Sequence, residues 1–98
     1  MNDRLTRCRA LLEELKLDGV IVSDPTDVRY LSGFRGEDTT LLVGRDAALL
    51  CTDSRFWEQV HEEVDGFELV RAQGADLLAD TAAAAAERLG PAAALGFQ

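Results

Sequence analysis

The sequence predicts a three-layer α/β domain in which helices pack on a mixed sheet of about five strands. Three observations lead to this fold class. Apolar residues recur at helical spacing in several segments, short aliphatic runs lie between those segments, and two of these runs are joined by a loop that fits an antiparallel hairpin. Because 98 residues can enclose only one hydrophobic core, we expect residues 1–98 to form one domain.

The first third of the chain predicts a helix, a strand and a second helix. Residues 5–15 place leucines and a cysteine on one stripe of a helix, with charged residues opposite. Residues 20–22 are aliphatic without polar alternation, as in a strand that is covered on both faces. The second helix begins with Asp24 as its N-cap and Pro25 at its first position, and Gly33 ends it.

Two apolar runs in the middle of the chain predict the hairpin. Residues 41–43 and 47–51 are joined by residues 44–46, a loop that contains glycine and is short enough to force the two strands to run antiparallel. The sheet is therefore expected to be mixed.

The second half of the chain predicts a helix, a strand, a helix and a last strand. Residues 56–64 carry apolar side chains at helical spacing, either Asp53 or Ser54 would cap that helix, and residues 67–70 predict a strand. From residue 75 an alanine-rich helix follows, whose buried face is predicted to consist of Leu78, Ala82, Ala85 and Leu89. Residues 92–97 predict the last strand, and we interpret the ending directly after it as a cut in a longer chain.

The charge of the chain argues against nucleic acid and membrane surfaces as partners. Ten Lys and Arg face eighteen Asp and Glu, which leaves a formal net charge of −8 that repels phosphate and anionic lipid. No apolar run approaches the ~20 residues of a membrane span, and the start of the chain lacks a secretory signal. We therefore expect a cytoplasmic protein.

The reactive side chains are too few for a catalytic or metal site. Cys8 and Cys51 lie among aliphatic residues without a CxxC motif, and we interpret both as reduced thiols of the core. His61 is the only histidine, so neither a metal-ligand set nor a nucleophile with its base can be assembled. We expect no cofactor and no catalysis in this domain.

Two loops hold the unusual residues. Residues 30–36 crowd two aromatic rings and an arginine between glycines, and residues 52–57 place polar groups at the start of a helix. A purely structural interpretation stays open for both. Tyr30 and Phe34 would then belong to the core, and Asp53 would cap the helix while Arg55 pairs with an acid.

Taken together, these loops resemble the N-terminal domain of the creatinase, prolidase and aminopeptidase P family. The family's motifs correspond here to Asp24-Pro25, Tyr30-Leu31-Ser32-Gly33-Phe34 and Thr52-Asp53-Ser54-Arg55-Phe56, in the same order. The likeness covers residues 4–97, and it implies a ribonuclease H-like fold. Phe56 stands where the family often has tyrosine, so no role of that hydroxyl group carries over.

The resemblance implies a role beside a larger catalytic domain. In the family, a pita-bread domain that follows this one binds two divalent metals of the Mn, Co or Zn type and cleaves bonds next to proline, and none of its ligands falls on these residues. The resemblance further implies contacts with that C-terminal domain and with a second subunit in a homo-oligomer, and a position beside the substrate entrance. The candidate residues for the entrance or interface are Tyr30, Phe34, Arg35, Asp53, Arg55 and Trp57.

Two further expectations accompany this interpretation. If Phe56 faces the core, Trp57 lies about 100° around the helix and points outward, so it or the loop of residues 30–35 should mediate a dimer contact. The alternative is a stand-alone acidic interaction domain or a receiver-like module that holds Mg²⁺ with clustered carboxylates such as Asp24 and Asp53. Creatinase itself and a histone-chaperone subunit reuse the domain, so the resemblance leaves the reaction of a parent chain open.

Overall fold

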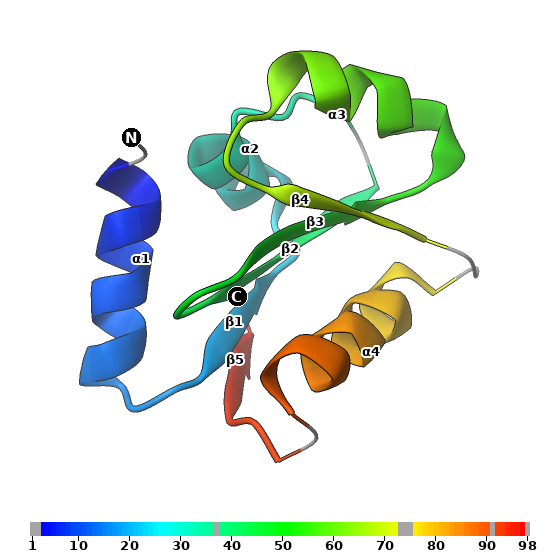
Figure 1. Ribbon diagram of the computed structural model, residues 1–98. Coiled ribbons are helices and arrows are strands. Elements are labelled where there is room, and N and C mark those ends of the chain that lie inside the picture. The colour runs from blue at the N-terminus through cyan, green and yellow to red at the C-terminus, as the bar shows by residue number, and fades with distance from the viewer. Residues whose placement is uncertain (1–2, 37, 73–75, 91, 98) are drawn as a thin grey trace.

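Five strands form one mixed sheet through the middle of the molecule (Figure 1). The computed structural model describes residues 3–36, 38–72, 76–90 and 92–97. The strands are β1 (Gly19–Val22), β2 (Thr39–Gly44), β3 (Ala48–Thr52), β4 (Glu68–Arg71) and β5 (Leu95–Phe97). The helices are α1 (Asp3–Glu14), α2 (Pro25–Ser32), α3 (Trp57–Glu63) and α4 (Leu77–Leu89), with a 3₁₀ turn η1 (Ser54–Phe56) before α3. This architecture confirms the predicted α/β fold class.

The strand order is β4-β3-β2-β1-β5, and β2 alone runs against the other four. The predicted hairpin is present between β2 and β3, with Thr39 opposite Thr52 and Val43 opposite Ala48. Its turn closes through the amide of Gly44, which donates to the carbonyl of Ala47 at 2.8 Å. The strands β1 and β3 carry the parallel partners β5 and β4.

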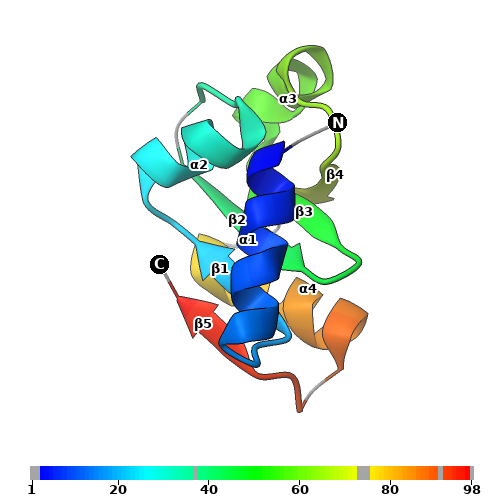
Figure 2. The ribbon, with the colours of Figure 1, turned by 90° about the vertical axis from the view of Figure 1, so that its left-hand side faces the viewer.

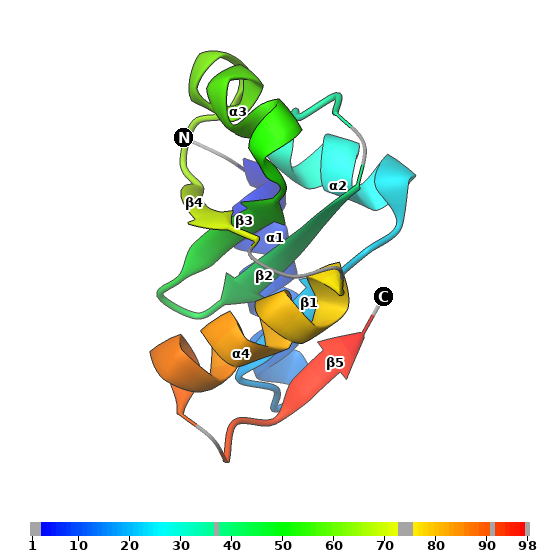
Figure 3. The same cartoon turned by 90° about the vertical axis from the view of Figure 1, so that its right-hand side faces the viewer.

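Helices cover both faces of the sheet, because successive side chains of each strand point to opposite sides. Figure 2 shows α1 across one face, with α2 and α3 on the same side, and Figure 3 shows α4 across the other. The first face buries Val22, Leu41 and Leu50 against Val28, Leu31, Phe34 and Val60, and Val43 against Leu5 and Leu12 of α1. The second face buries Ile21, Leu42 and Leu49 against Ala85.

The predicted helix caps are confirmed. The carboxylate of Asp24 accepts from the amides of Thr26 at 2.8 Å and Asp27 at 3.3 Å, and Gly33 ends α2 with φ 78°. Such a left-handed conformation is accessible to glycine at little cost. Asp53 caps the short turn η1, so the chain begins to coil at Ser54, slightly before the predicted helix.

The predicted buried face of α4 is wrong in its first half. Leu78 is 40% exposed and Ala82 is exposed, whereas Thr81 is 1% exposed and faces the sheet together with Ala85. The hydroxyl of Thr81 donates to the carbonyl of Leu77 at 2.8 Å and pairs with the hydroxyl of Thr40. Because the hydroxyls of Thr81 and Thr40 both have hydrogen-bond partners, a threonine can occupy this core position. Hydrophobicity alone predicts an apolar residue there.

The last strand is also shorter than predicted. Residues 92–94 precede β5 instead of belonging to it, and they are held by Asp18. The carboxylate of Asp18 accepts from the amide of Ala94 at 2.8 Å, and the carbonyl of Ala94 accepts from the amide of Asp18 at 2.8 Å. The amide and carbonyl of Ala94 are therefore bonded to Asp18 and cannot pair with a neighbouring strand.

The two cysteines are free thiols, as predicted. Cys51 is buried in β3, and Cys8 is partly buried where α1 packs against the core. Burial raises the pKa of both thiols, which lowers the fraction of reactive thiolate at neutral pH.

We predict that Thr81→Val destabilises the domain far more than Ala82→Val. Valine at position 81 leaves the buried hydroxyl of Thr40 without its partner, which costs about 1–3 kcal/mol. Valine at the exposed position 82 changes only helix propensity, at most about 0.7 kcal/mol. Urea denaturation of the two variants measures the difference, and equal losses would contradict the observed face of α4.

Candidate functional site

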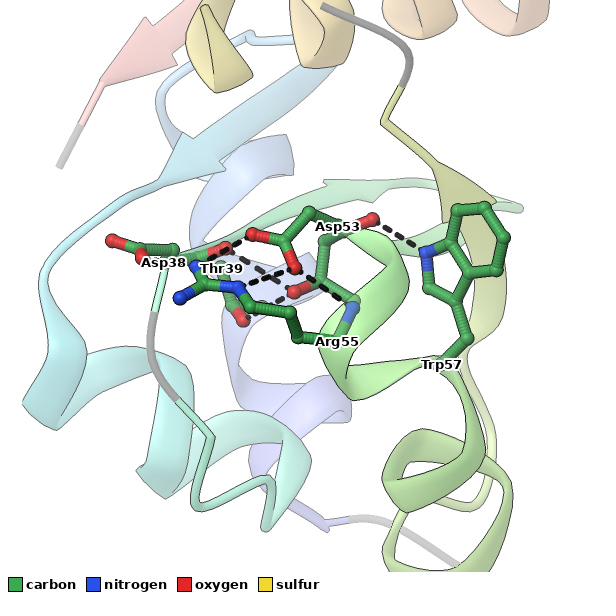
Figure 4. A network of polar contacts seen from close by, with 6 residues as sticks. Asp38, Thr39, Asp53, Arg55 and Trp57 are labelled. Atoms are coloured by element: carbon green, nitrogen blue, oxygen red, sulfur yellow. Dashed lines mark hydrogen bonds and ion pairs between the residues drawn. The ribbon is translucent and has the colours of Figure 1, made fainter. Parts of the chain in front are cut away.

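Arg55 lies between two carboxylates at the end of β3 (Figure 4). Its Nε and Nη2 donate to the two oxygens of Asp53 at 3.0 and 2.7 Å, and Nη2 also donates to Asp38 at 2.7 Å. The side chains of Arg55 and Asp38 are 63% and 65% exposed, so water and salt screen the contact. The two carboxylates neutralise the guanidinium and leave one net negative charge at this place.

The electrostatics of this contact shift two ionisable groups. The hydrogen bond from Arg55 holds the pKa of the Asp53 carboxyl below its ordinary value of 3.8. In return, the hydrogen bonds to Asp53 and Asp38 raise the pKa of the Arg55 guanidinium. Both side chains are therefore charged at neutral pH.

Thr52, at the end of β3, forms hydrogen bonds to three neighbouring segments. Its hydroxyl donates to the carbonyl of Asp38 at 3.2 Å and accepts from the hydroxyl of Thr39 at 3.1 Å. Its carbonyl accepts from the indole Nε1 of Trp57 at 2.8 Å and from the amide of Ala72 at 3.0 Å. The start of β2, the start of α3 and the end of β4 are thus all tied to one buried residue.

The structure corrects the expected exposure of Trp57. The ring is partly buried, because its nitrogen reaches Thr52 and the guanidinium of Arg71 lies 4.8 Å from the ring centroid. Phe56 is partly buried as well. Among the described residues, the exposed large apolar side chains lie elsewhere, at Leu11, Leu15, Tyr30, Leu78 and Phe97.

The loop after α2 divides its side chains between the core and the surface. Phe34 is 1% exposed and meets the ring of Phe56 edge-on, with centroids 6.1 Å apart. A side chain at Gly36 would begin 2.2 Å from the ring of Phe34, so the glycine gives this ring its place. For Phe34 the structural interpretation therefore holds, and this residue can brace the loop but not line an opening.

Tyr30 lies in the last turn of α2 instead of in the loop that was expected over residues 30–36, and Arg35 lies in the loop that follows; both remain at the surface. Tyr30 is 47% exposed, with the guanidinium of Arg4 4.4 Å from its ring centroid. The amide of Arg35 donates to Glu63 of α3 at 3.2 Å. In the part of the chain that the structure describes, no carboxylate pairs with the guanidinium of Arg35.

A hollow of about 610 Å³ lies beside the arginine contact. Asp38 and Thr39 line it on the side of β2, and the first residues of α2 and α4 line it from both faces of the sheet, among them Pro25 and Leu77. The structure thus brings Asp53, Arg55 and Trp57 together around Thr52, and the amide of Arg35 reaches the other end of α3 at Glu63.

Asp38, Thr39 and the hydrogen bonds that converge on Thr52 were not predicted from the sequence. Asp38 adopts φ 48°, a left-handed conformation that aspartate tolerates better than most residues. Its pairing with Arg55 spans 17 positions, and no local pattern signals such a contact.

The described residues do not form a metal site or a membrane span. No three His, Cys, Asp or Glu side chains converge within ranges 3–36, 38–72, 76–90 and 92–97. No helix in these ranges is both long and apolar enough to cross a bilayer.

The sequence of this chain is similar to sequences of known proteins. Residues 4–98 match the model of the creatinase/prolidase N-terminal domain. A curated relative, the uncharacterized peptidase YqhT of Bacillus subtilis, is 35% identical over 79 residues. The match covers 81% of this chain and 22% of that protein, so the chain spans about a fifth of the relative's length.

Solved structures show the same fold. An Xaa-Pro dipeptidase from Bacillus anthracis superimposes with a TM-score of 0.82 at 28% identity, over 98% of this chain and 26% of that one. The N-terminal domain of a candidate metallopeptidase from Corynebacterium diphtheriae gives 0.77 at 32% identity, over 98% and 76%. The N-terminal domain of the cytoplasmic peptidase PepQ from Mycobacterium tuberculosis gives 0.73 at 25% identity, over 100% and 92%.

We predict that Asp53→Asn destabilises the domain at neutral pH but not in acid. Asparagine keeps the cap but loses the charge that Arg55 binds. Because the pKa of Asp53 is lowered on folding, its charge stabilises the domain fully above 3.8 and loses this effect as the pH falls through the lower pKa of the folded state.

Urea midpoints of both proteins, measured from neutral pH to well below 3.8, test this dependence. The wild-type midpoint should exceed that of the variant at neutral pH and converge with it in acid. A difference that stays constant with pH would show that the charge of Asp53 is not the cause.

Proposed function

The chain belongs to the creatinase/prolidase N-terminal domain family, and from this membership we propose that it is the non-catalytic N-terminal domain of an Xaa-Pro metallopeptidase of the prolidase or aminopeptidase P type. In this role it contributes to subunit association and borders the substrate entrance. The observation that carries the proposal is the family match over residues 4–98, joined to a fold shared with N-terminal domains of peptidases.

The lengths of the relatives support a second domain. This chain corresponds to 22% of YqhT and 26% of the B. anthracis dipeptidase, so most of each relative lies outside the match. The proposed partners are therefore a C-terminal catalytic domain of the same polypeptide and a second subunit. By likeness to the mycobacterial PepQ, the proposed location is the cytoplasm.

The described residues of this chain do not fit the two divalent metals of such an enzyme. His61 is exposed on α3, both cysteines lie in or against the core, and no three potential ligands converge among the described residues. Divalent metals need three or more convergent donors. The proposal therefore assigns metal chemistry to the catalytic domain and no step of it to this one.

The entrance role is assigned to the surface of the two loops. Tyr30 is exposed there and no carboxylate pairs with the guanidinium of Arg35 among the described residues, which leaves both able to contact a substrate or a second subunit. Arg55 pairs with Asp53 and Trp57 bonds to Thr52 in the second loop, and the buried Phe34 of the first loop packs against Phe56 of the second. The guanidinium of Arg35 and the ring of Tyr30 are thus both available to a partner at this surface.

No observation favours the receiver-like alternative. Asp24 and Asp53 are each engaged as helix caps, and the described residues contain no carboxylate cluster that could hold Mg²⁺. The reading frame that follows position 98 distinguishes the remaining interpretations. A downstream set of metal ligands supports the peptidase, and a stop codon supports a stand-alone interaction domain.

We predict that the chain of residues 1–98 neither binds Mn²⁺, Co²⁺ or Zn²⁺ tightly nor hydrolyses Xaa-Pro peptides. The physical reason is the shortage of convergent ligands among the described residues. Calorimetric titration with each metal and a proline-release assay test both parts. Stoichiometric binding with turnover that persists after repurification would contradict the proposal.

We further predict that Arg35→Ala in the full-length enzyme raises KM for an Xaa-Pro peptide by about two- to fivefold, the size expected for one exposed ionic contact. Arg29→Ala is the matched control, because Arg29 is also exposed and the change removes the same charge from the preceding helix. Metal content and kcat should not change. An equal effect of both substitutions would argue against an entrance role of Arg35.

A further inference from the structure

Arg4 joins the first turn of α1 to the last turn of α2, and Figure 2 shows these two helix ends beside each other. Its Nη1 donates to the main-chain carbonyl of Tyr30 at 2.9 Å. The guanidinium of the same arginine lies 4.4 Å from the centroid of the Tyr30 ring. One residue therefore contacts Tyr30 twice, once at the backbone and once at the side chain.

The bond to the carbonyl serves the end of α2. Carbonyls in the last turn of a helix have no partner within the helix. The amide of Phe34, four positions after Tyr30, donates to the hydroxyl of Ser32 at 3.1 Å instead of to Tyr30. The guanidinium of Arg4 supplies the missing donor, and a cation is favourable beside the negative end of a helix dipole. This contact has a structural reason that does not involve the ring.

The contact with the ring adds something that the helix end does not require. Tyr30 is 47% exposed, and exposed side chains change rotamer within picoseconds to nanoseconds unless a contact restrains them. A cation over an aromatic face provides such a contact. The ring is thus held in one position before a partner binds, which reduces the entropy that binding costs.

The helix that carries Arg4 is itself firmly anchored. Leu5 and Leu12 of α1 are buried against the sheet. Arg9 donates from Nε and Nη2 to the carbonyls of Gly44 and Ala47, at 2.9 and 3.2 Å, and so ties α1 to the hairpin turn. Arg4 therefore acts on Tyr30 from a fixed support.

The surroundings of Tyr30 suit a small ligand better than a second protein. The other large apolar side chains that are exposed among the described residues line hollows elsewhere, namely Leu11, Leu15 and Phe97 in one and Leu78 in another. A standard protein interface buries about 800 Å² on each partner, and one half-exposed ring supplies a small part of that area. A proline-containing peptide, in contrast, packs directly on exposed aromatic rings.

We propose that Arg4 is a positioning residue, which fixes the ring of Tyr30 so that an Xaa-Pro peptide packs against it at the substrate entrance. This inference rests on the proposed function, because it takes Tyr30 to border the entrance. Arg4 acts through Tyr30 and does not touch the peptide. Its effect falls on KM and not on kcat, because the groups that cleave the peptide belong to another domain.

The test is a double-mutant cycle in the full-length enzyme, with Arg4→Met, Tyr30→Leu and both together. Leucine at position 30 keeps the carbonyl that Arg4 bonds and removes only the aromatic ring. We expect Arg4→Met to raise KM about two- to fivefold at unchanged kcat, the size of one exposed cation–π contact. In the Tyr30→Leu background, Arg4→Met should leave KM unchanged, because no ring is left to position.

Two further variants separate positioning from a general effect of charge or stability. Arg4→Lys keeps a cation that can lie over the ring, so its KM should lie between those of the wild type and Arg4→Met. Arg7→Met is the matched control, because Arg7 is exposed on the same helix and the change removes the same charge. Its KM should equal that of the wild type. Urea midpoints verify that each variant is folded at the assay temperature.

The contact itself is visible by NMR in residues 1–98. Tyr30 is the only tyrosine, so its ring signals are unambiguous. We expect nuclear Overhauser effects between the ring protons and the side-chain methylenes of Arg4. Their absence would overturn the proposal without any measurement of activity.

The kinetic outcomes distinguish this proposal from the proposed function. Active wild-type enzyme with the same KM in Arg4→Met overturns the role of Arg4 alone. An equal rise of KM with and without the ring overturns it as well, because Arg4 would then act only on the helix end. Loss of subunit association at unchanged KM would show that the ring serves a second subunit instead. Absence of hydrolysis in the metal-loaded wild type overturns the proposed function, and the role of Arg4 with it.

Discussion

The end of β3 is the place on which the surrounding structure depends, because one buried threonine satisfies several chain segments there. Thr52 is fully buried, and its hydroxyl and carbonyl together make four hydrogen bonds. Burying these polar groups is tolerable only when each finds a partner. The same bonds that remove this cost fix the start of β2, the indole of Trp57 and the exit of β4, so the geometry around residues 52–57 follows from a requirement of the core.

The parts of the fold that depend on neighbouring residues could be predicted from the sequence. Caps at Asp24 and Gly33 and the hairpin of β2 and β3 are local, since each rests on a few consecutive residues and their allowed backbone angles. The orientation of α4 could not be predicted in the same way. It depends on a hydrogen bond between Thr81 and Thr40, which lie 41 positions apart. The spacing of apolar residues does not reveal a threonine whose hydroxyl has a partner in the core.

In the candidate site, too, local features could be predicted from the sequence and contacts between distant segments could not. The motifs around Tyr30 and Asp53 indicated where unusual residues lie, and the cap by Asp53 followed from its position before a helix. Burial of Phe34, the partial burial of Trp57 and the second carboxylate at Arg55 required the three-dimensional structure, because each depends on a segment distant in sequence. The family resemblance supplied the fold and the domain type, and physical contacts decided which of the loop residues remain available to a partner.

The close approach of Gly36 to Phe34 limits how this loop can vary during evolution or engineering. A methyl group at position 36 would occupy the volume of the aromatic ring, so the two positions cannot change independently. A smaller residue at position 34 would have to appear first, and it would leave a void beneath the loop until position 36 grew to fill it. Surveys of natural variants and libraries that randomise the loop should therefore treat positions 34 and 36 as one unit, which varies as a pair of matched volumes.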